Sequence, residues 1–113
     1  MFSFRIHDWV RPYTTRRLEI LAAAYRDAGD FERAIAAGEE AVRTNPTGMN
    51  GHLILISALV ASKNLPRARE NAERLISQTR DVSVERFIEG APYKDTDHRD
   101  QIKQALLAAG VPK

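Results

Sequence analysis

The chain contains no cysteine among its 113 residues. That absence excludes disulfide bridges and thiolate metal sites, and it fits a reducing compartment. Long apolar runs are also missing. No stretch approaches the ~20 apolar residues of a membrane span, and the opening segment MFSFRIHDWV lacks the apolar core of a secretory signal. We therefore expect a soluble cytoplasmic protein with no membrane partner.

The chain also lacks a strong charge of either sign. Its formal charge is +2 at pH 7, from 17 Lys and Arg against 15 Asp and Glu. The N-terminal end is locally basic through Arg5, Arg11, Arg16 and Arg17, but no aromatic stacking partners at binding spacing and no recognisable nucleic-acid module accompany these side chains. We interpret them as a solvated or contact face, with phosphate binding as the minor alternative, and expect no nucleic-acid partner.

Motifs for catalysis and cofactor binding are missing as well. Gly48 and Gly51 are followed by neither a second spaced glycine nor Lys-Ser/Thr, so a phosphate loop is not indicated. His52 lies in an apolar segment without a cysteine partner or a Gly-x-Ser-x-Gly elbow. We interpret His52 as a histidine that replaces a core aromatic residue, and we expect neither enzyme activity nor a cofactor.

One dense group of potential metal ligands occurs near the C-terminus, comprising Asp95, Asp97, His98 and Asp100. A calcium loop that began at Asp95 would need Gly as its sixth residue and Glu as its twelfth. Those positions hold Asp100 and Leu106. We interpret the acidic residues as favourable charge at a helix N-terminus, worth ~0.3–1 kcal/mol each, and expect no metal site.

What the sequence does contain is an internal repeat. Residues 16–46 and 50–80 align without a gap at an offset of 34 residues, as in the pair Ala34 and Ala68 (68 − 34 = 34). Further apolar pairs keep the same register: Leu21 with Leu55, Tyr25 with Leu59, Phe31 with Leu65, Ala41 with Leu75 and Val42 with Ile76. A period of ~34 residues is typical of helix-turn-helix repeat arrays, which bind other molecules.

The first unit resembles a tetratricopeptide repeat. The matching residues are Leu18 where the family often has Trp, then Leu21, the small Ala22, Tyr25, the turn Gly29, Phe31, Ala34, Ala41 and the closing Pro46. The second unit is a degenerate copy, with His52, Ile56, Lys63 and Arg80 at positions where the family has other residues. The resemblance implies an all-α fold, a right-handed α-α superhelix of tetratricopeptide repeats closed by C-terminal capping helices.

The helix signals agree with that fold. We expect helices over residues 15–28, 30–44 and 48–62, a fourth that begins after Asn64 with Pro66 in its first turn, and two more over 83–89 and 97–109. Gly29 can take the left-handed conformation that ends a helix, and Asp30 and Asn64 can cap the helices that follow. No strand signal competes.

These signals divide the chain into four parts. Residues 1–14 form either an N-terminal arm or the remnant of a preceding repeat, residues 15–48 the first repeat, residues 49–82 the second, and residues 83–113 the capping helices. In the first part Phe2, Phe4, Ile6 and Trp9 favour the remnant, whereas Asp8 falls where that family prefers an aliphatic residue. Both alternatives stay open.

The expected core lies between the helices and comprises Tyr25, Phe31, Ala34, Leu55, Leu59 and Ala68. The helix over 48–62 is apolar on all sides, through residues such as Leu53 and Val60, so it needs cover on every side. Three partners can supply that cover: the C-terminal helices with their stripe of Ile102, Leu106 and Leu107, a second copy of the chain, or an apolar ligand segment.

The C-terminal segment carries a narrower resemblance. Residues 91–95, APYKD, and residues 109–112, AGVP, are similar to the closing segment of bacterial repeat domains that follow adenylate or guanylate cyclase-like catalytic domains or winged-helix DNA-binding regulators. This resemblance implies that the chain is the C-terminal regulatory piece of a longer signalling protein. Nothing in these residues indicates cyclase chemistry.

A binding groove is placed by the same family resemblance, in which the first helix of each repeat lines the concave face. The residues so placed are Arg16, Glu19, Ala23, Arg26, Asp27, Asn50, Leu53, Ser57 and Val60. Family members that clamp a terminal carboxylate use lysines and asparagines where this chain has Glu19, Ala23, Leu53 and Ser57. We therefore expect a mixed polar and apolar groove, occupied by a helix or by the chain's own tail.

Three functional hypotheses follow. The first is a protein-protein interaction module with a protein or peptide partner. The second is a homo-oligomerisation domain, favoured by the apolar helix over 48–62. The third is a small enzyme or a nucleic-acid binder, and only His52 or the N-terminal arginines support it.

Overall fold

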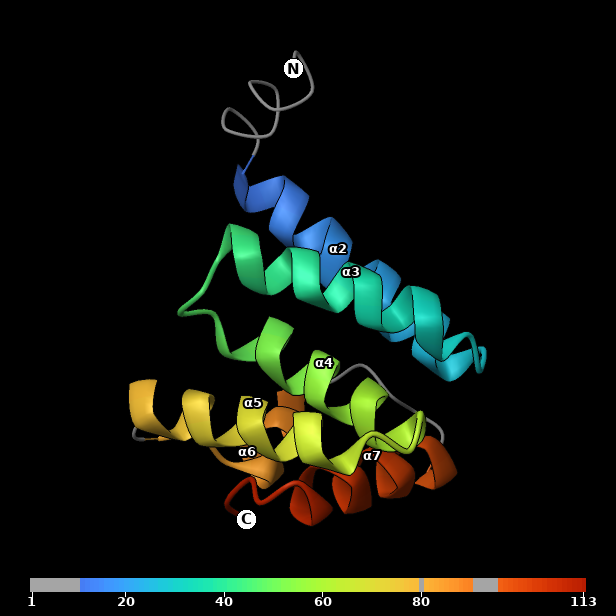
Figure 1. Cartoon of the computed structure of the whole chain (residues 1–113), viewed down its shortest axis with the longest axis vertical. Helices are drawn as coiled ribbons and strands as arrows, with labels where there is room; N and C mark the ends of the chain where they lie inside the picture. Colours follow the sequence, from blue (N-terminus) through green and yellow to red (C-terminus); the bar gives the residue numbers. More distant parts are fainter. Residues whose placement is uncertain (1–10, 80, 91–95) are drawn as a thin grey trace.

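The structure is a computed structural model that describes residues 11–79, 81–90 and 96–113, with the side chains of 14–79, 81–89, 97 and 99–113. In these ranges the chain is all-α, and no strand occurs in them. The helices pack in sequence (Figure 1). Their bounds are α2 (Arg11–Asp27), α3 (Phe31–Thr44), α4 (Met49–Ala61), α5 (Leu65–Gln78), α6 (Val84–Gly90) and α7 (Thr96–Ala108).

Helix α2 begins at Arg11, before the expected start at residue 15. The boundary drawn at residue 14 therefore falls inside a helix. Of residues 1–14, for which an arm and a repeat remnant are the alternatives, the structure describes only 11–14, and neither alternative is tested. The tail motif over 91–95 also lies outside the described residues.

The ends of the helices repeat at the offset seen in the sequence. Helices α3 and α5 begin 34 residues apart (65 − 31) and end 34 residues apart (78 − 44). The side chains of Asp30 and Asn64 accept hydrogen bonds from the backbone N–H groups of Arg33 and Arg67, at 3.3 and 3.5 Å. Both expected caps are therefore confirmed.

The turns that precede these caps share a left-handed residue. Gly29 has φ +84°, and Lys63, at the same place in the second pair of helices, has φ +68°. A left-handed conformation costs a residue with a Cβ roughly 1–2 kcal/mol, whereas glycine adopts it freely. The second turn thus keeps the geometry of the first without its glycine.

We expect Lys63→Gly to stabilise the chain. It removes the left-handed penalty, and the greater freedom of glycine in the unfolded chain offsets part of that gain, which leaves about 0.5–1 kcal/mol. The reverse change, Gly29→Lys, meets no atom within 4 Å of the new Cβ, so its cost is the conformational penalty alone. Urea unfolding of both variants measures the two effects, and an unchanged midpoint for both would contradict the expectation.

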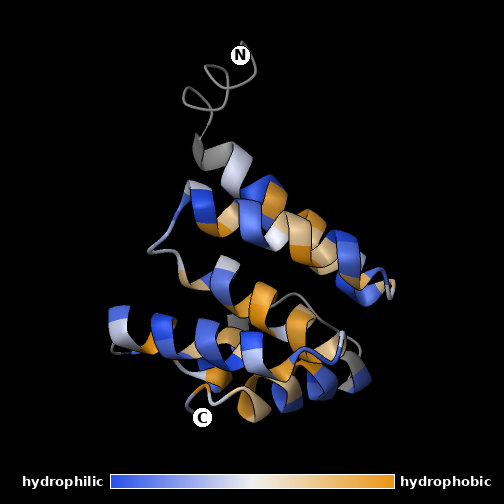
Figure 2. Cartoon of the chain, viewed as in Figure 1, coloured by the Kyte–Doolittle hydropathy of each residue, from blue (hydrophilic) through white to orange (hydrophobic). Residues whose placement is uncertain are grey.

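The core is centred on α4, whose residues from Gly51 to Leu59 are all buried. Helix α4 packs against α3, α5 and α7 and also contacts α2. Figure 2 shows α4 as the most consistently hydrophobic helix in view, within more polar neighbours. Its apolar character on all sides is therefore explained by cover on all sides.

The expected core residues divide into two groups. Ala34, Leu55, Leu59 and Ala68 are buried as expected, at 0–2% exposure. The expectation is wrong for the aromatic pair, because Tyr25 and Phe31 are only partly buried. The guanidinium carbon of Arg33 lies 5.9 Å from the centroid of the Tyr25 ring, and Phe31 lines a cavity. Both rings therefore face partly away from the core.

Three partners were considered for the apolar surface of α4. In the structure, the chain's own C-terminal helices pack on it. Ile102 and Leu106 of α7 are buried in the same cluster as Leu53, and Leu107 packs against it. The chain end is fixed as well, because the backbone N–H of Val84 donates to the Pro112 carbonyl at 2.8 Å.

A glycine sets how closely α3 and α4 approach. A Cβ built on Gly38 would lie 3.1 Å from Leu55 Cβ and 3.3 Å from Leu55 Cα. Most real Cβ atoms keep a larger separation, so α3 passes α4 at a distance that only a glycine fits without adjustment.

Candidate functional site

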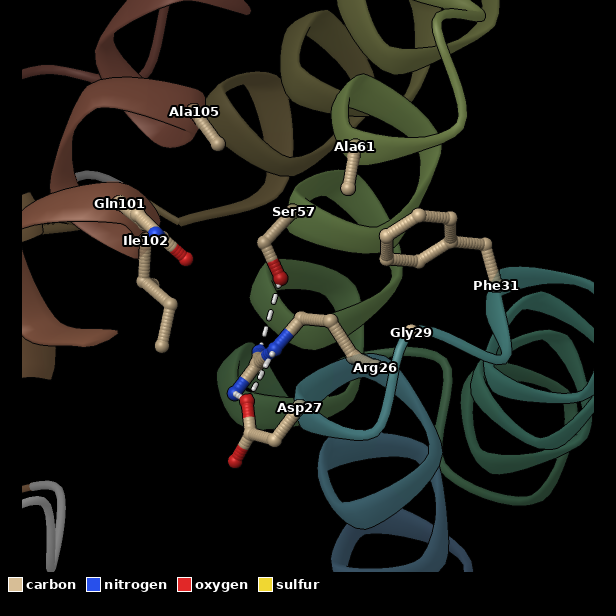
Figure 3. Close-up of a pocket in the computed structure, with 9 residues that line it drawn as sticks. All are labelled: Arg26, Asp27, Gly29, Phe31, Ser57, Ala61, Gln101, Ile102 and Ala105. Carbon is tan, nitrogen blue, oxygen red and sulfur yellow. Dashed lines mark hydrogen bonds and ion pairs between the residues drawn. The ribbon is translucent and has the colours of Figure 1, made fainter. Parts of the chain in front are cut away.

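A cavity lies where the C-terminal end of α2, the following turn, α4 and α7 meet (Figure 3). Its volume is about 180 Å³. An engineered cavity of ~150 Å³ admits benzene, so this space suits one large side chain or a group of similar size. The lining residues are Arg26, Asp27, Gly29, Phe31, Ser57, Ala61, Gln101, Ile102 and Ala105.

The polar side of the cavity is built on Arg26, in the last turn of α2. Its guanidinium donates from Nη1 to Ser57 Oγ at 2.8 Å and from Nε to Asp27 Oδ1 at 3.1 Å (Figure 3). The Ser57 hydroxyl in turn donates to the Ile54 carbonyl at 2.8 Å, one turn back in α4. The hydrogen bonds therefore fix Arg26 and tie the end of α2 to the middle of α4.

Charge in the cavity is close to balanced. Arg26 is 6% exposed, and burying a cation is costly unless an anion and hydrogen bonds accompany it. The carboxylate of Asp27, whose side chain is 28% exposed, supplies the opposite charge. A cationic or anionic ligand would thus meet a compensated pair, and a neutral polar group is the better match.

The other side of the cavity is apolar. Figure 3 shows Phe31 and Ala61 facing the cavity from the α3 and α4 side, and Ile102 and Ala105 facing it from α7. The side chain of Gln101, on α7, places an amide near the polar side. The cavity can therefore hold a group with an apolar body and a hydrogen-bonding tip.

The structure brings together only part of the predicted groove. Arg26, Asp27 and Ser57 line the cavity. Arg16 and Asn50 are exposed, whereas Glu19, Ala23 and Val60 are partly buried. The family resemblance places Leu53, Ser57 and Arg26 on the groove face, but in the structure they are buried, at 0%, 1% and 6% exposure.

These groove residues are buried because of the position of α7. This helix packs on α4 and covers the α4 side of the predicted groove. An open groove that runs along both α2 and α4 is therefore replaced by a smaller cavity between α2, α4 and α7, as expected for a groove occupied by the chain's own tail.

One groove residue has an altered acidity. Partial burial raises the pKa of Glu19, and the positive charge of Arg16 acts in the opposite direction. Glu19 lies on α2 and does not line the cavity. Glu19 is thus a carboxyl group on a partly desolvated helix face, apart from the cavity.

The sequence indicated the chain's own tail as one possible occupant of the groove, but it did not identify which residues line the cavity. Ile102 was expected only as part of an apolar stripe, and Gln101, Ala105 and Ala61 carried no motif. Their role depends on how the tail folds back, which no local pattern encodes. The only feature of the sequence that indicated this packing was the apolar helix α4, which needs other residues to bury it on every side.

His52 occupies the core, as its apolar surroundings indicated. Its side chain is 0% exposed, and Nε2 donates to the Pro46 carbonyl at 2.6 Å. The ring thereby ties α4 to the loop after α3. Its other nitrogen, Nδ1, is buried without a hydrogen-bond partner.

The potential metal ligands near the C-terminus lie partly outside the described residues, since Asp95 and the His98 side chain are not described. Among the side chains that the structure does describe, no three His, Asp or Glu residues converge as a metal site would require. Within the same part of the chain, no helix has the length and apolar character needed to cross a membrane.

Comparisons with protein-family models, with curated proteins and with solved structures each found no match to this chain.

Proposed function

We propose that the chain is a non-catalytic protein-protein interaction module of the tetratricopeptide type. The repeated helix ends, the repeated caps and the repeated left-handed turn support two such units over α2–α5. Contacts of α4 with both α3 and α2 also support this arrangement, since each helix pair of an array packs on its neighbour. We also propose that the repeats form a right-handed superhelix and that the chain is part of a longer bacterial signalling protein.

The observation that carries the functional proposal is the cavity between α2, α4 and α7. It joins a fixed polar side, formed by Arg26 and Ser57, to an apolar side near Phe31 and Ala105. Binding pockets generally combine an apolar lining with a few placed polar groups. The partner we propose is a peptide segment that inserts one side chain with an apolar body and a neutral polar tip, such as tyrosine or glutamine.

Two features set this site apart from a carboxylate clamp. The Arg26 guanidinium is already paired with Asp27, and α7 closes the side of the groove that a long peptide backbone would follow. We therefore propose recognition of a single anchoring side chain, with the rest of the peptide lying over the exposed ends of α2 and α7.

Ala105→Leu tests the proposal. Ala105 is partly buried and lines the cavity, so a larger side chain there fills the space that the anchor would take. Peptides selected from a random displayed library on the unmodified chain should bind this variant at least about tenfold more weakly, a loss of ~1.4 kcal/mol.

Ala108→Leu is the matched control. It makes the same change on α7 at an exposed position away from the cavity, and it should leave binding unchanged. Fluorescence anisotropy with the selected peptides measures both affinities, and circular dichroism checks that both variants keep their helices. Failure to select any peptide, or equal binding by the two variants, would count against the cavity as the site.

A further inference from the structure

The polar groups that line the cavity differ in how far their hydrogen bonds are already made within the chain. The Ser57 hydroxyl donates its only proton to the Ile54 carbonyl and accepts a hydrogen bond from Arg26. The guanidinium of Arg26 is fixed by its bonds to Ser57 and Asp27. Both Ser57 and Arg26 are buried, at 1% and 6% exposure. These two side chains therefore build the polar wall, and their bonds within the chain limit what they can offer to a ligand.

Gln101 on α7 is the contrasting case. Its side chain is exposed, lines the cavity and makes no hydrogen bond within the part of the chain that the structure describes. Figure 3 shows its amide directed into the cavity from α7, across from Ser57 and Arg26. A primary amide has an acceptor oxygen and two donor protons, and rotation of its terminal torsion exchanges their places. Gln101 can therefore bond a group that donates, accepts or does both.

The size and lining of the cavity favour an aromatic anchor. The volume is about 180 Å³, and a cavity of ~150 Å³ admits benzene. The ring of Phe31 faces this space, with Ile102 and Ala105 on the α7 side, and aromatic rings pack favourably against one another in offset or edge-to-face contacts. Tyrosine combines a ring of this size with a hydroxyl that both donates and accepts. A hydroxyl that leaves water loses free energy unless it finds a new partner, and Gln101 has the unused capacity to supply one.

We propose that Gln101 determines the specificity of the cavity by hydrogen bonding the hydroxyl of a tyrosine anchor, so that the site favours tyrosine over phenylalanine. This inference rests on the proposed function, because it requires a peptide that inserts a side chain into the cavity. It goes further by naming the anchor and the residue that recognises its polar tip.

A matched pair of peptides tests the inference. Peptides are selected from a displayed library on the unmodified chain. The anchor is the peptide residue whose replacement by alanine weakens binding to the unmodified chain but not to Ala105→Leu. We expect this residue to be tyrosine. The second peptide carries phenylalanine at the anchor, and fluorescence anisotropy should show that it binds about threefold to tenfold more weakly, the usual effect of one neutral hydrogen bond.

Gln101→Met keeps the length of the side chain and removes its hydrogen-bonding groups. This variant should bind both peptides equally, through a loss of affinity for the tyrosine peptide alone. Gln104→Met is the matched control, at an exposed position of α7 outside the cavity lining, and it should keep the preference for tyrosine. A purely structural role for Gln101 would weaken both peptides in the same proportion. Circular dichroism verifies that both variants are folded.

The outcomes separate this inference from the proposed function. A preference for tyrosine that survives Gln101→Met, or an anchor other than tyrosine, would overturn the inference while the cavity remained the binding site. Equal binding of the selected peptides by Ala105→Leu and Ala108→Leu would instead overturn the cavity as the site, and the role of Gln101 with it. Failure to select any peptide would count against both in the same way.

Discussion

Removal of residues 96–113 is expected to abolish cooperative unfolding and to cause aggregation. The deletion removes α7 and the segment after it, including Ile102, Leu106 and Val111, which are buried in the core cluster. Burial of each such side chain contributes about 1.5–3 kcal/mol. The sum approaches the 5–15 kcal/mol that typically separates folded from unfolded domains, so little stability would remain.

The same deletion exposes α4 along the face that α7 covers, and an apolar helix face open to water promotes association. Size-exclusion chromatography with light scattering and thermal unfolding followed by circular dichroism measure the two effects. A truncated chain that stays monomeric and unfolds at the original temperature would show that α7 is not required as a cover.

A pair of point substitutions separates the role of the apolar contact from the loss of chain length. Leu106→Asp places a carboxylate at a position that is 0% exposed, and it should reproduce most of the effect of the deletion, because a buried charge without a partner is costly. Gln104→Asp introduces the same group at an exposed position on α7 and should change stability by less than about 0.5 kcal/mol.

The sequence predicted the helices well because their ends carry local signals. Asp30 and Asn64 cap α3 and α5, and Gly29 adopts the left-handed turn that its lack of a Cβ allows. These signals act over three or four residues, and a single sequence displays them fully. The internal repeat then predicted the burial of Ala34 and Ala68, but it did not predict every paired position, since Leu21 is 39% exposed and its counterpart Leu55 only 2%.

The site could be predicted only in part, because it depends on contacts between distant segments. The family resemblance placed Arg26, Asp27 and Ser57 on one face, and they do lie together. It also placed Leu53 on the groove face, whereas α7 packs on α4 and Leu53 is buried. The position of α7 follows from tertiary packing of an apolar stripe, and the stripe alone does not specify which surface it covers.

The apolar helix over 48–62 was also the reason to consider self-association. Burial of Leu53 beneath the chain's own C-terminal helices removes that surface. Among the described residues, the large apolar side chains that are exposed are Ile20 and Leu21 on α2, at 60% and 39%, and Ile76 on α5, at 38%. Overall hydrophobicity of a helix therefore did not predict the exposed patch, because cover by other helices decides which apolar residues reach the surface.

The glycine at the crossing of α3 and α4 gives the second large effect. We expect Gly38→Leu to destabilise the chain by about 3 kcal/mol or more, at the upper end of the range for overpacked cores. Even the first carbon of a new side chain would lie 3.1 Å from Leu55 Cβ, and the remaining carbons must displace α4. Because α4 contacts α2, α3, α5 and α7, a shift of this helix disturbs most of the core.

Gly51→Ala is the matched control, at a glycine of α4 that is also buried. A Cβ there would lie 3.5 Å from Ala41 Cβ, an ordinary contact. Alanine also favours the helix over glycine by up to about 1 kcal/mol, so this variant should be as stable as the original chain or more stable. Urea unfolding should therefore give changes of opposite sign at the two glycines. Equal tolerance of both substitutions would mean that α3 and α4 do not cross as closely as the structure places them.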